Sequence, residues 1–79
     1  MKYSEKEIAR QGRRLDTLEA AEQSLIKSIT AFRIRECDYE DSDLYKATVQ
    51  LELRLKKRIA EVSSRLMYMK QEAIKEEIA

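Results

Sequence analysis

Apolar residues in the first half of the chain recur at the spacing of one face of an α-helix. The face consists of Ile8, Leu15, Leu18, Leu25, Ile29 and Phe32. Gaps of three, four or seven residues place these side chains on one narrow stripe. The pattern predicts a helix over residues 4–37.

Three local features refine this first helix. Ser4 followed by Glu7 has the spacing of a capping box, which satisfies amide groups of the first turn. Gly12 lowers helix propensity, so we expect the first turns to fray or bend there. The stripe lacks a member between Leu18 and Leu25, where Ala21 and Glu22 compete. We expect Ala21 to fill the gap, because an unpaired buried glutamate is costly to desolvate.

The second half of the chain predicts a longer helix over residues 43–78. Its main apolar stripe is Leu44, Thr48, Leu51, Leu55, Ile59, Val62, Leu66, Met69 and Ala73. Two consecutive four-residue steps, Leu51 to Leu55 to Ile59, interrupt the alternation of three and four. Such a stutter locally relaxes the supercoil of paired helices.

A second apolar stripe runs beside the main one on the same predicted helix. Its members are Val49, Leu53, Ala60, Met67, Ile74 and Ile78. One neighbouring helix covers only a narrow stripe, so these residues require another partner. We expect self-association through Val49, Leu53, Met67, Ile74 and Ile78.

The two predicted helices have similar lengths and are separated by a turn over residues 38–42. A short connection between long helices is typical of antiparallel neighbours. The fold-class prediction is therefore all-α: a coiled-coil-like antiparallel helical hairpin, forming a single domain over residues 1–79. Two such hairpins pairing through the second stripe would make a homodimeric four-helix bundle.

The turn region, Glu36–Tyr45, reads ECDYEDSDLY and is rich in acids. Asp41 or Ser42 is expected to cap the second helix. The carboxylate of Asp43 is expected to interact favourably with the positive, N-terminal end of that helix's dipole. Acids at the end of the first helix have no such benefit. We predict a partner-binding surface made of Asp38, Tyr39, Glu40 and Tyr45. The alternative for the tyrosines is packing over the hairpin tip, where Cys37 is expected to cover the end of the bundle.

Composition argues against catalysis. The chain has no histidine, one glycine and one cysteine, so His-dependent nucleophile pairs, phosphate-binding glycine loops and multi-cysteine zinc sites cannot form. The acids of the turn lack the glycine and glutamate that a calcium-binding EF-hand loop requires. We expect no enzymatic activity, no cofactor and no bound metal.

The same composition bears on location. No segment approaches the roughly 20 apolar residues of a membrane-spanning helix, and Met1–Arg14 has no apolar core of a secretory signal. A lone cysteine fits a reducing compartment. We expect a cytoplasmic protein without membrane association.

Charge is balanced, with 16 basic and 15 acidic side chains. This balance disfavours, without excluding, nucleic-acid binding, for which the candidate contacts are Arg10, Arg13, Arg14, Arg54, Lys57 and Arg58. In an antiparallel hairpin Arg58 would lie opposite Glu22, and Arg65 opposite Asp16. An interhelical ladder of ion pairs is therefore the preferred interpretation of that edge.

Together these observations predict a non-enzymatic protein-interaction module. A small regulator, inhibitor or adaptor that binds another protein fits best, of the kind common among bacterial and phage accessory proteins. The alternatives are a nucleic-acid-binding bundle and a structural or scaffolding subunit, the latter marked by association that does not close.

Overall fold

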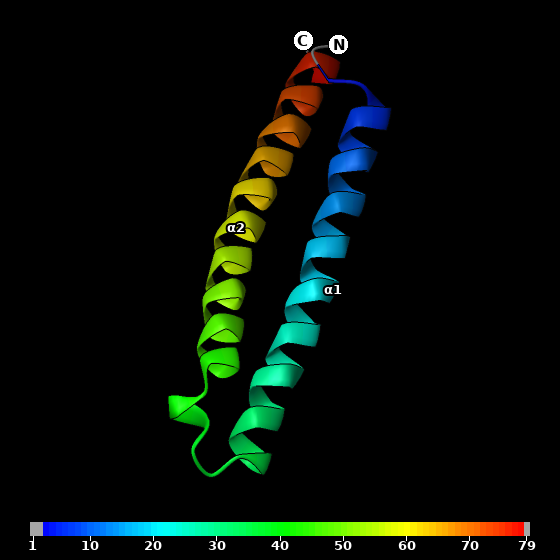
Figure 1. Ribbon diagram of the computed structural model, residues 1–79. Coiled ribbons are helices and arrows are strands. Elements are labelled where there is room, and N and C mark those ends of the chain that lie inside the picture. Colours follow the sequence, from blue (N-terminus) through cyan, green and yellow to red (C-terminus); the bar gives the residue numbers. More distant parts are fainter. Residues whose placement is uncertain (1–2, 79) are drawn as a thin grey trace.

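The structure is a hairpin of two long helices (Figure 1). It is a computed structural model that describes residues 3–78. Helix α1 spans Glu5–Arg35, helix α2 spans Asp43–Ile78, and one turn of 3-10 helix, η1, spans Tyr39–Asp41 between them. The helices lie side by side and antiparallel, in a rod of 60 × 14 × 14 Å. The predicted all-helical hairpin is confirmed, although α1 ends two residues earlier than expected.

The predicted helix caps are present. The Glu7 amide donates to Ser4 Oγ over 3.2 Å, and the Ser4 amide donates to Glu7 Oε2 over 3.4 Å. This reciprocal capping box satisfies donors that the first turn leaves without helical partners. At the start of α2, the Tyr45 amide donates to Ser42 Oγ over 3.3 Å. Ser42, one of the two predicted caps, therefore supplies the acceptor.

The two helices face each other through strictly alternating steps of three and four residues. On α1 the repeat runs through half-buried residues: Ile8, Gln11, Leu15, Leu18, Glu22, Leu25, Ile29 and Phe32. On α2 it runs through buried or half-buried residues: Tyr45, Thr48, Glu52, Leu55, Ile59, Val62, Leu66, Met69 and Ala73. This alternation is the heptad repeat of a coiled coil. We call these positions the hairpin interface. Other half-buried residues flank the repeat: Gly12 and Ala31 on α1, and Val49, Ser63 and Glu72 on α2.

The strict repeat overturns the predicted stutter. Leu44 and Leu51 are 72% and 52% exposed, and the residue after each of them, Tyr45 or Glu52, faces α1 instead. The physical reason is continuity of the supercoil: a stutter would turn the rest of the stripe away from its partner helix. The stabilisation from continuous packing along the whole length of the helices outweighs the cost of desolvating one glutamate.

The continuous repeat also determines which residue of α1 occupies the interface position between Leu18 and Leu25. Ala21 is exposed and Glu22 is half-buried at the hairpin interface, so the expectation of Ala21 is wrong. The alternation of three and four from Leu18 to Leu25 passes through residue 22, and the side chain follows the repeat. Since Glu22 keeps part of its surface in water, its carboxylate avoids the full desolvation penalty.

A pair of helices buries few side chains completely. Among residues 3–78, the apolar side chains that are fully buried are Val62, Leu66 and Met69, all on α2 toward the open end of the rod. At that end the rings of Tyr3 and Tyr68 meet edge to face, with centroids 6.2 Å apart. Most of the hairpin interface is therefore only half-covered, and the fold has a small core for its length.

Helix α1 continues without a break through Gly12, so the expected loosening does not interrupt it. Beyond its chain neighbours and the backbone of its own helix, a β-carbon at residue 12 would meet no atom within 4 Å, and the backbone there has no positive φ. We therefore expect Gly12→Ala to stabilise the protein by about 0.5–1 kcal/mol, because alanine restricts the unfolded chain without straining the helix. Thermal unfolding followed by circular dichroism measures the effect. The exposed Ala20→Gly is a control, with a loss of similar size; a destabilised Gly12→Ala would contradict the prediction.

Candidate functional site

The second stripe lies on one long edge of the rod. Leu53 is 52% exposed, Met67 is 60% exposed, and Ile74 and Ile78 are also exposed. Val49 differs, because it is half-buried beside the hairpin interface and offers less surface than predicted. Four of the five predicted self-association residues thus present apolar side chains to solvent on α2.

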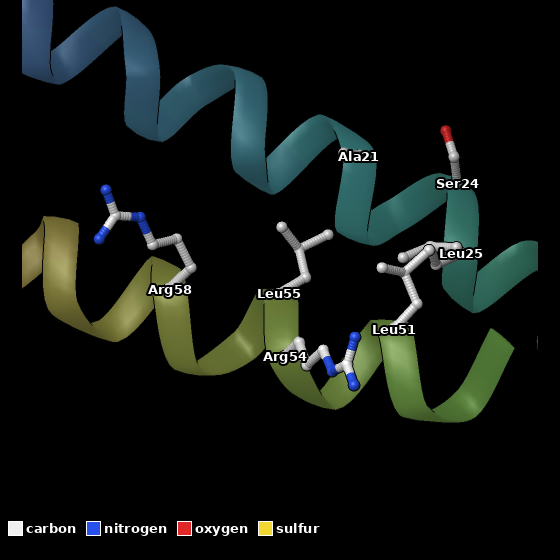
Figure 2. A pocket seen from close by; sticks show the side chains of 7 residues that line it. All are labelled: Ala21, Ser24, Leu25, Leu51, Arg54, Leu55 and Arg58. Carbon is white, nitrogen blue, oxygen red and sulfur yellow. The ribbon is translucent and has the colours of Figure 1, made fainter. Parts of the chain in front are cut away.

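A groove that sequence reasoning did not identify lies between the helices near mid-length (Figure 2). It has a volume of ≈ 640 Å³ and is lined by Ala21, Ser24, Leu25, Leu51, Arg54, Leu55 and Arg58. In Figure 2, leucine side chains of α2 reach toward α1, where Leu25 lies near them and Ala21 and Ser24 carry short side chains. We call this the arginine-edged groove. Its signal in the sequence was Leu51, which the predicted stutter had assigned to the hairpin interface.

The hairpin tip is closed by aromatic side chains. The Tyr45 ring packs edge to face against Phe32 of α1, with centroids 5.9 Å apart, and against Tyr39 of η1, at 4.9 Å. Tyr39 and Tyr45 are both half-buried. The alternative anticipated for the tyrosines, packing over the tip, therefore describes what these rings do.

The Tyr45 hydroxyl is also engaged. It accepts hydrogen bonds from Arg33 Nε at 3.2 Å and from Arg33 Nη2 at 3.1 Å. These bonds raise the pKa of the Arg33 guanidinium above its usual value. The contact ties the last turns of α1 to the first turn of α2 and fixes the orientation of the tip.

The other predicted tip residues face solvent. Asp38 and Glu40 are exposed, and the Asp38 side chain makes no capping hydrogen bond to η1. Cys37 is also exposed with a free thiol, so the expectation that it covers the bundle end is wrong. The aromatic cluster closes the tip in its place.

The predicted ladder of ion pairs between the helices is wrong. The Arg58 guanidinium lies 3.1 Å from Glu61 of its own helix, and not beside Glu22. The ion pairs formed among residues 3–78 all lie inside α2: Lys56–Glu52, Arg58–Glu61 and Lys75–Glu72. Glu22 is half-buried at the hairpin interface, whereas Arg58 is exposed and pairs with Glu61.

The candidate nucleic-acid contacts are all exposed, but they do not form one cluster. Arg10 and Arg13 line a shallow hollow at the open end, whereas Arg54 and Arg58 edge the groove near mid-length. Arg10 also lines a hollow with Arg65 of α2. The basic side chains are thus distributed along the rod, as the sequence indicated.

In residues 3–78, neither helix has a segment apolar enough and long enough to cross a lipid bilayer. Over the same residues, the acidic and cysteine side chains do not form clusters of three or more that could hold a metal ion.

Comparison with protein-family models, with curated proteins and with solved structures finds no match to this chain.

Proposed function

We propose that this chain is a non-enzymatic interaction module that self-associates through the second stripe and binds another protein. The observation that carries the proposal is that the chain exposes more surface to solvent than a compact monomer of its mass. The accessible surface is 6270 Å². A compact monomer of 9.3 kDa would expose about 5000 Å².

The surplus of about 1300 Å² has the size of a protein interface. Obligate homodimers bury about 2000–5000 Å² in total, or at least about 1000 Å² from each protomer. Pairing of two hairpins along one edge would remove about this much from each rod. A dimeric four-helix bundle is therefore the assembly we propose.

The kind of surface supports this assembly. Among residues 3–78, nine large apolar side chains are exposed, compared with three that are buried. Monomeric proteins rarely leave large contiguous apolar surfaces in water. Four of the nine belong to the second stripe: Leu53, Met67, Ile74 and Ile78. Leu53, Ala60, Met67 and Ile74 recur at seven-residue intervals on one edge of α2, the spacing of a further coiled-coil contact.

Recognition of a different protein is the second half of the proposal. At the hairpin tip, Asp38 and Glu40 present exposed carboxylates that the fold does not use for capping. They lie beside an aromatic cluster that holds the tip in one shape. Such a surface is complementary in charge to a basic patch on a partner protein. The free, exposed thiol of Cys37 is compatible with a reducing, cytoplasmic compartment. The module would act as a regulator, inhibitor or adaptor by occupying that partner.

We expect Asp38→Asn with Glu40→Gln to leave the thermal midpoint unchanged or slightly higher, because the two acids follow the negative end of the α1 dipole. Binding to a protein captured with the wild-type chain should weaken by about tenfold, the effect of removing two exposed charge contacts. Calorimetric titration measures the affinity and differential scanning the stability. The matched control is Glu76→Gln with Glu77→Gln at the other end of the rod; equal weakening by both pairs would contradict a role for the tip.

A further inference from the structure

We infer that the arginine-edged groove docks an amphipathic helix of a partner protein whose apolar stripe is flanked by acidic residues. This inference rests on the proposed function as a protein-binding module and names both a surface and the chemistry of what it binds. The groove is distinct from the second stripe and from the hairpin tip.

The first observation is the exchange of places between Leu51 and Glu52. Glu52 is only 6% exposed at the hairpin interface, while Leu51 beside it is 52% exposed in the groove. The continuous repeat turns residue 52 inward and residue 51 outward. A chain selected for the stability of the hairpin alone would therefore carry a leucine at residue 52 and a polar residue at 51. Departures from local design rules that the fold does not need are expected at functional surfaces. Leu51 is therefore placed for a ligand outside the hairpin.

The second observation is the shape of the groove. Leu25, Leu51 and Leu55 form an apolar floor, while Ala21 and Ser24 form a low wall on α1. The Ser24 hydroxyl already donates to the Ala20 carbonyl over 3.3 Å. Short side chains allow another helix to approach closely, and an apolar floor accepts its apolar face.

The third observation is charge. Arg54 makes no ion pair or hydrogen bond within residues 3–78, and Arg58 meets only Glu61, in a pair of which both members are about half exposed. Two guanidinium groups thus stand at the margin of an apolar floor. Charge complementarity calls for carboxylates on the ligand, positioned beside its apolar residues.

The dimensions define the ligand further. From Leu51 to Arg58 the groove follows seven residue steps of α2, or about 10 Å at 1.5 Å per residue. This length matches two turns of a docked helix. Apolar side chains at positions i, i+3, i+4 and i+7 would cover the floor, with Asp or Glu on either flank.

A nucleic acid fits this surface less well. Phosphate backbones are held by basic and polar groups, and sequence-tolerant strands stack on aromatic rings. The groove offers a leucine floor, two arginines and no aromatic side chain. Its arrangement therefore favours a helix over a strand of RNA or DNA.

Two synthetic 15-residue helical peptides test the inference on the full chain. Both carry leucine at i, i+3, i+4 and i+7; one has glutamate on both flanks and the other has lysine. At physiological salt, fluorescence anisotropy should show the glutamate peptide binding about tenfold more tightly. Arg54→Glu with Arg58→Glu should remove or reverse this preference, while Lys57→Glu, outside the groove, should leave it in place.

Leu51 and Leu44 provide a matched pair, because both are exposed leucines of α2 and Leu44 lies outside both the groove and the second stripe. Leu51→Ala should weaken binding of the glutamate peptide about tenfold, and Leu44→Ala should not change it. Circular dichroism of each variant verifies folding. Equal effects of the two substitutions would overturn the inference, as would absent binding or equal affinity for both peptides.

Single-stranded RNA is included as a competitor. Displacement of the peptide by RNA, with RNA binding lost in Arg54→Glu/Arg58→Glu, would assign the groove to nucleic acid and overturn the inference. Sedimentation of the same samples separates this outcome from the proposed function. A dimer that shows no peptide preference would refute the groove and leave self-association standing.

Discussion

Leu53→Glu combined with Met67→Glu is expected to convert a dimer into a partly unfolded monomer. The wild-type chain should sediment at twice its mass of 9.3 kDa at micromolar concentration. Both side chains are exposed in the hairpin, so the substitutions remove little packing within one chain. In a four-helix bundle they would bury two carboxylates in each protomer against apolar surface, which excludes assembly.

Loss of the dimer should also reduce the helical signal. The hairpin alone buries few apolar side chains, and an obligate homodimer derives its stability from association. The thermal midpoint of the wild-type chain is accordingly expected to rise with protein concentration, and that of the double variant to be lower and independent of it. Analytical ultracentrifugation and circular dichroism measure the two effects.

Ile34→Glu is the matched control for this experiment. Ile34 is a highly exposed apolar residue of α1 outside the second stripe, so its substitution adds a carboxylate without touching the proposed dimer contact. It should sediment as the wild-type chain does. A wild-type chain that remains a stable, fully helical monomer at micromolar concentration would refute self-association and reassign the second stripe to binding of a different protein.

Glu52→Leu is expected to stabilise the protein more than any other single substitution in the hairpin interface. Glu52 Oε1 has no hydrogen-bond partner within the described residues, although Lys56 Nζ lies 3.4 Å away. The lysine is 60% exposed, so water screens its charge from the carboxylate. Leucine would remove an unsatisfied buried acceptor and extend the apolar surface of the hairpin interface. We expect the free energy of unfolding to rise by about 1–3 kcal/mol.

Such a gain corresponds to a rise in thermal midpoint of roughly 4–8 °C for each kcal/mol in a domain of this size. Glu52→Gln isolates the charge, because it keeps the shape and the polar group; its effect should be intermediate. Glu61→Leu, on the exposed side of α2, should change the midpoint little. A lower midpoint for Glu52→Leu would mean that a donor from a second copy satisfies the carboxylate in the assembled protein.

Local sequence signals were sufficient for the fold. The spacing of Ile8 to Phe32 on one segment and of Leu55 to Ala73 on the other identified both helices, and Ser4, Glu7 and Ser42 located their starts. These features act within one or two turns of helix, so they are legible without knowledge of the partner helix. The surplus of apolar positions, from which the second stripe was predicted, is likewise a property of one helix.

The inward or outward orientation of particular side chains depended on the packed pair. Residue by residue, Leu51 is a better interface residue than Glu52, and Ala21 a better one than Glu22. Two long helices stay in contact only if both keep one continuous repeat of three and four, so the repeat assigns these positions regardless of polarity. The groove around Leu51, and the pairing of Arg58 with Glu61 in place of Glu22, follow from that collective constraint. A preference summed over whole helices overrides the preferences of single residues, and only the tertiary structure contains that sum.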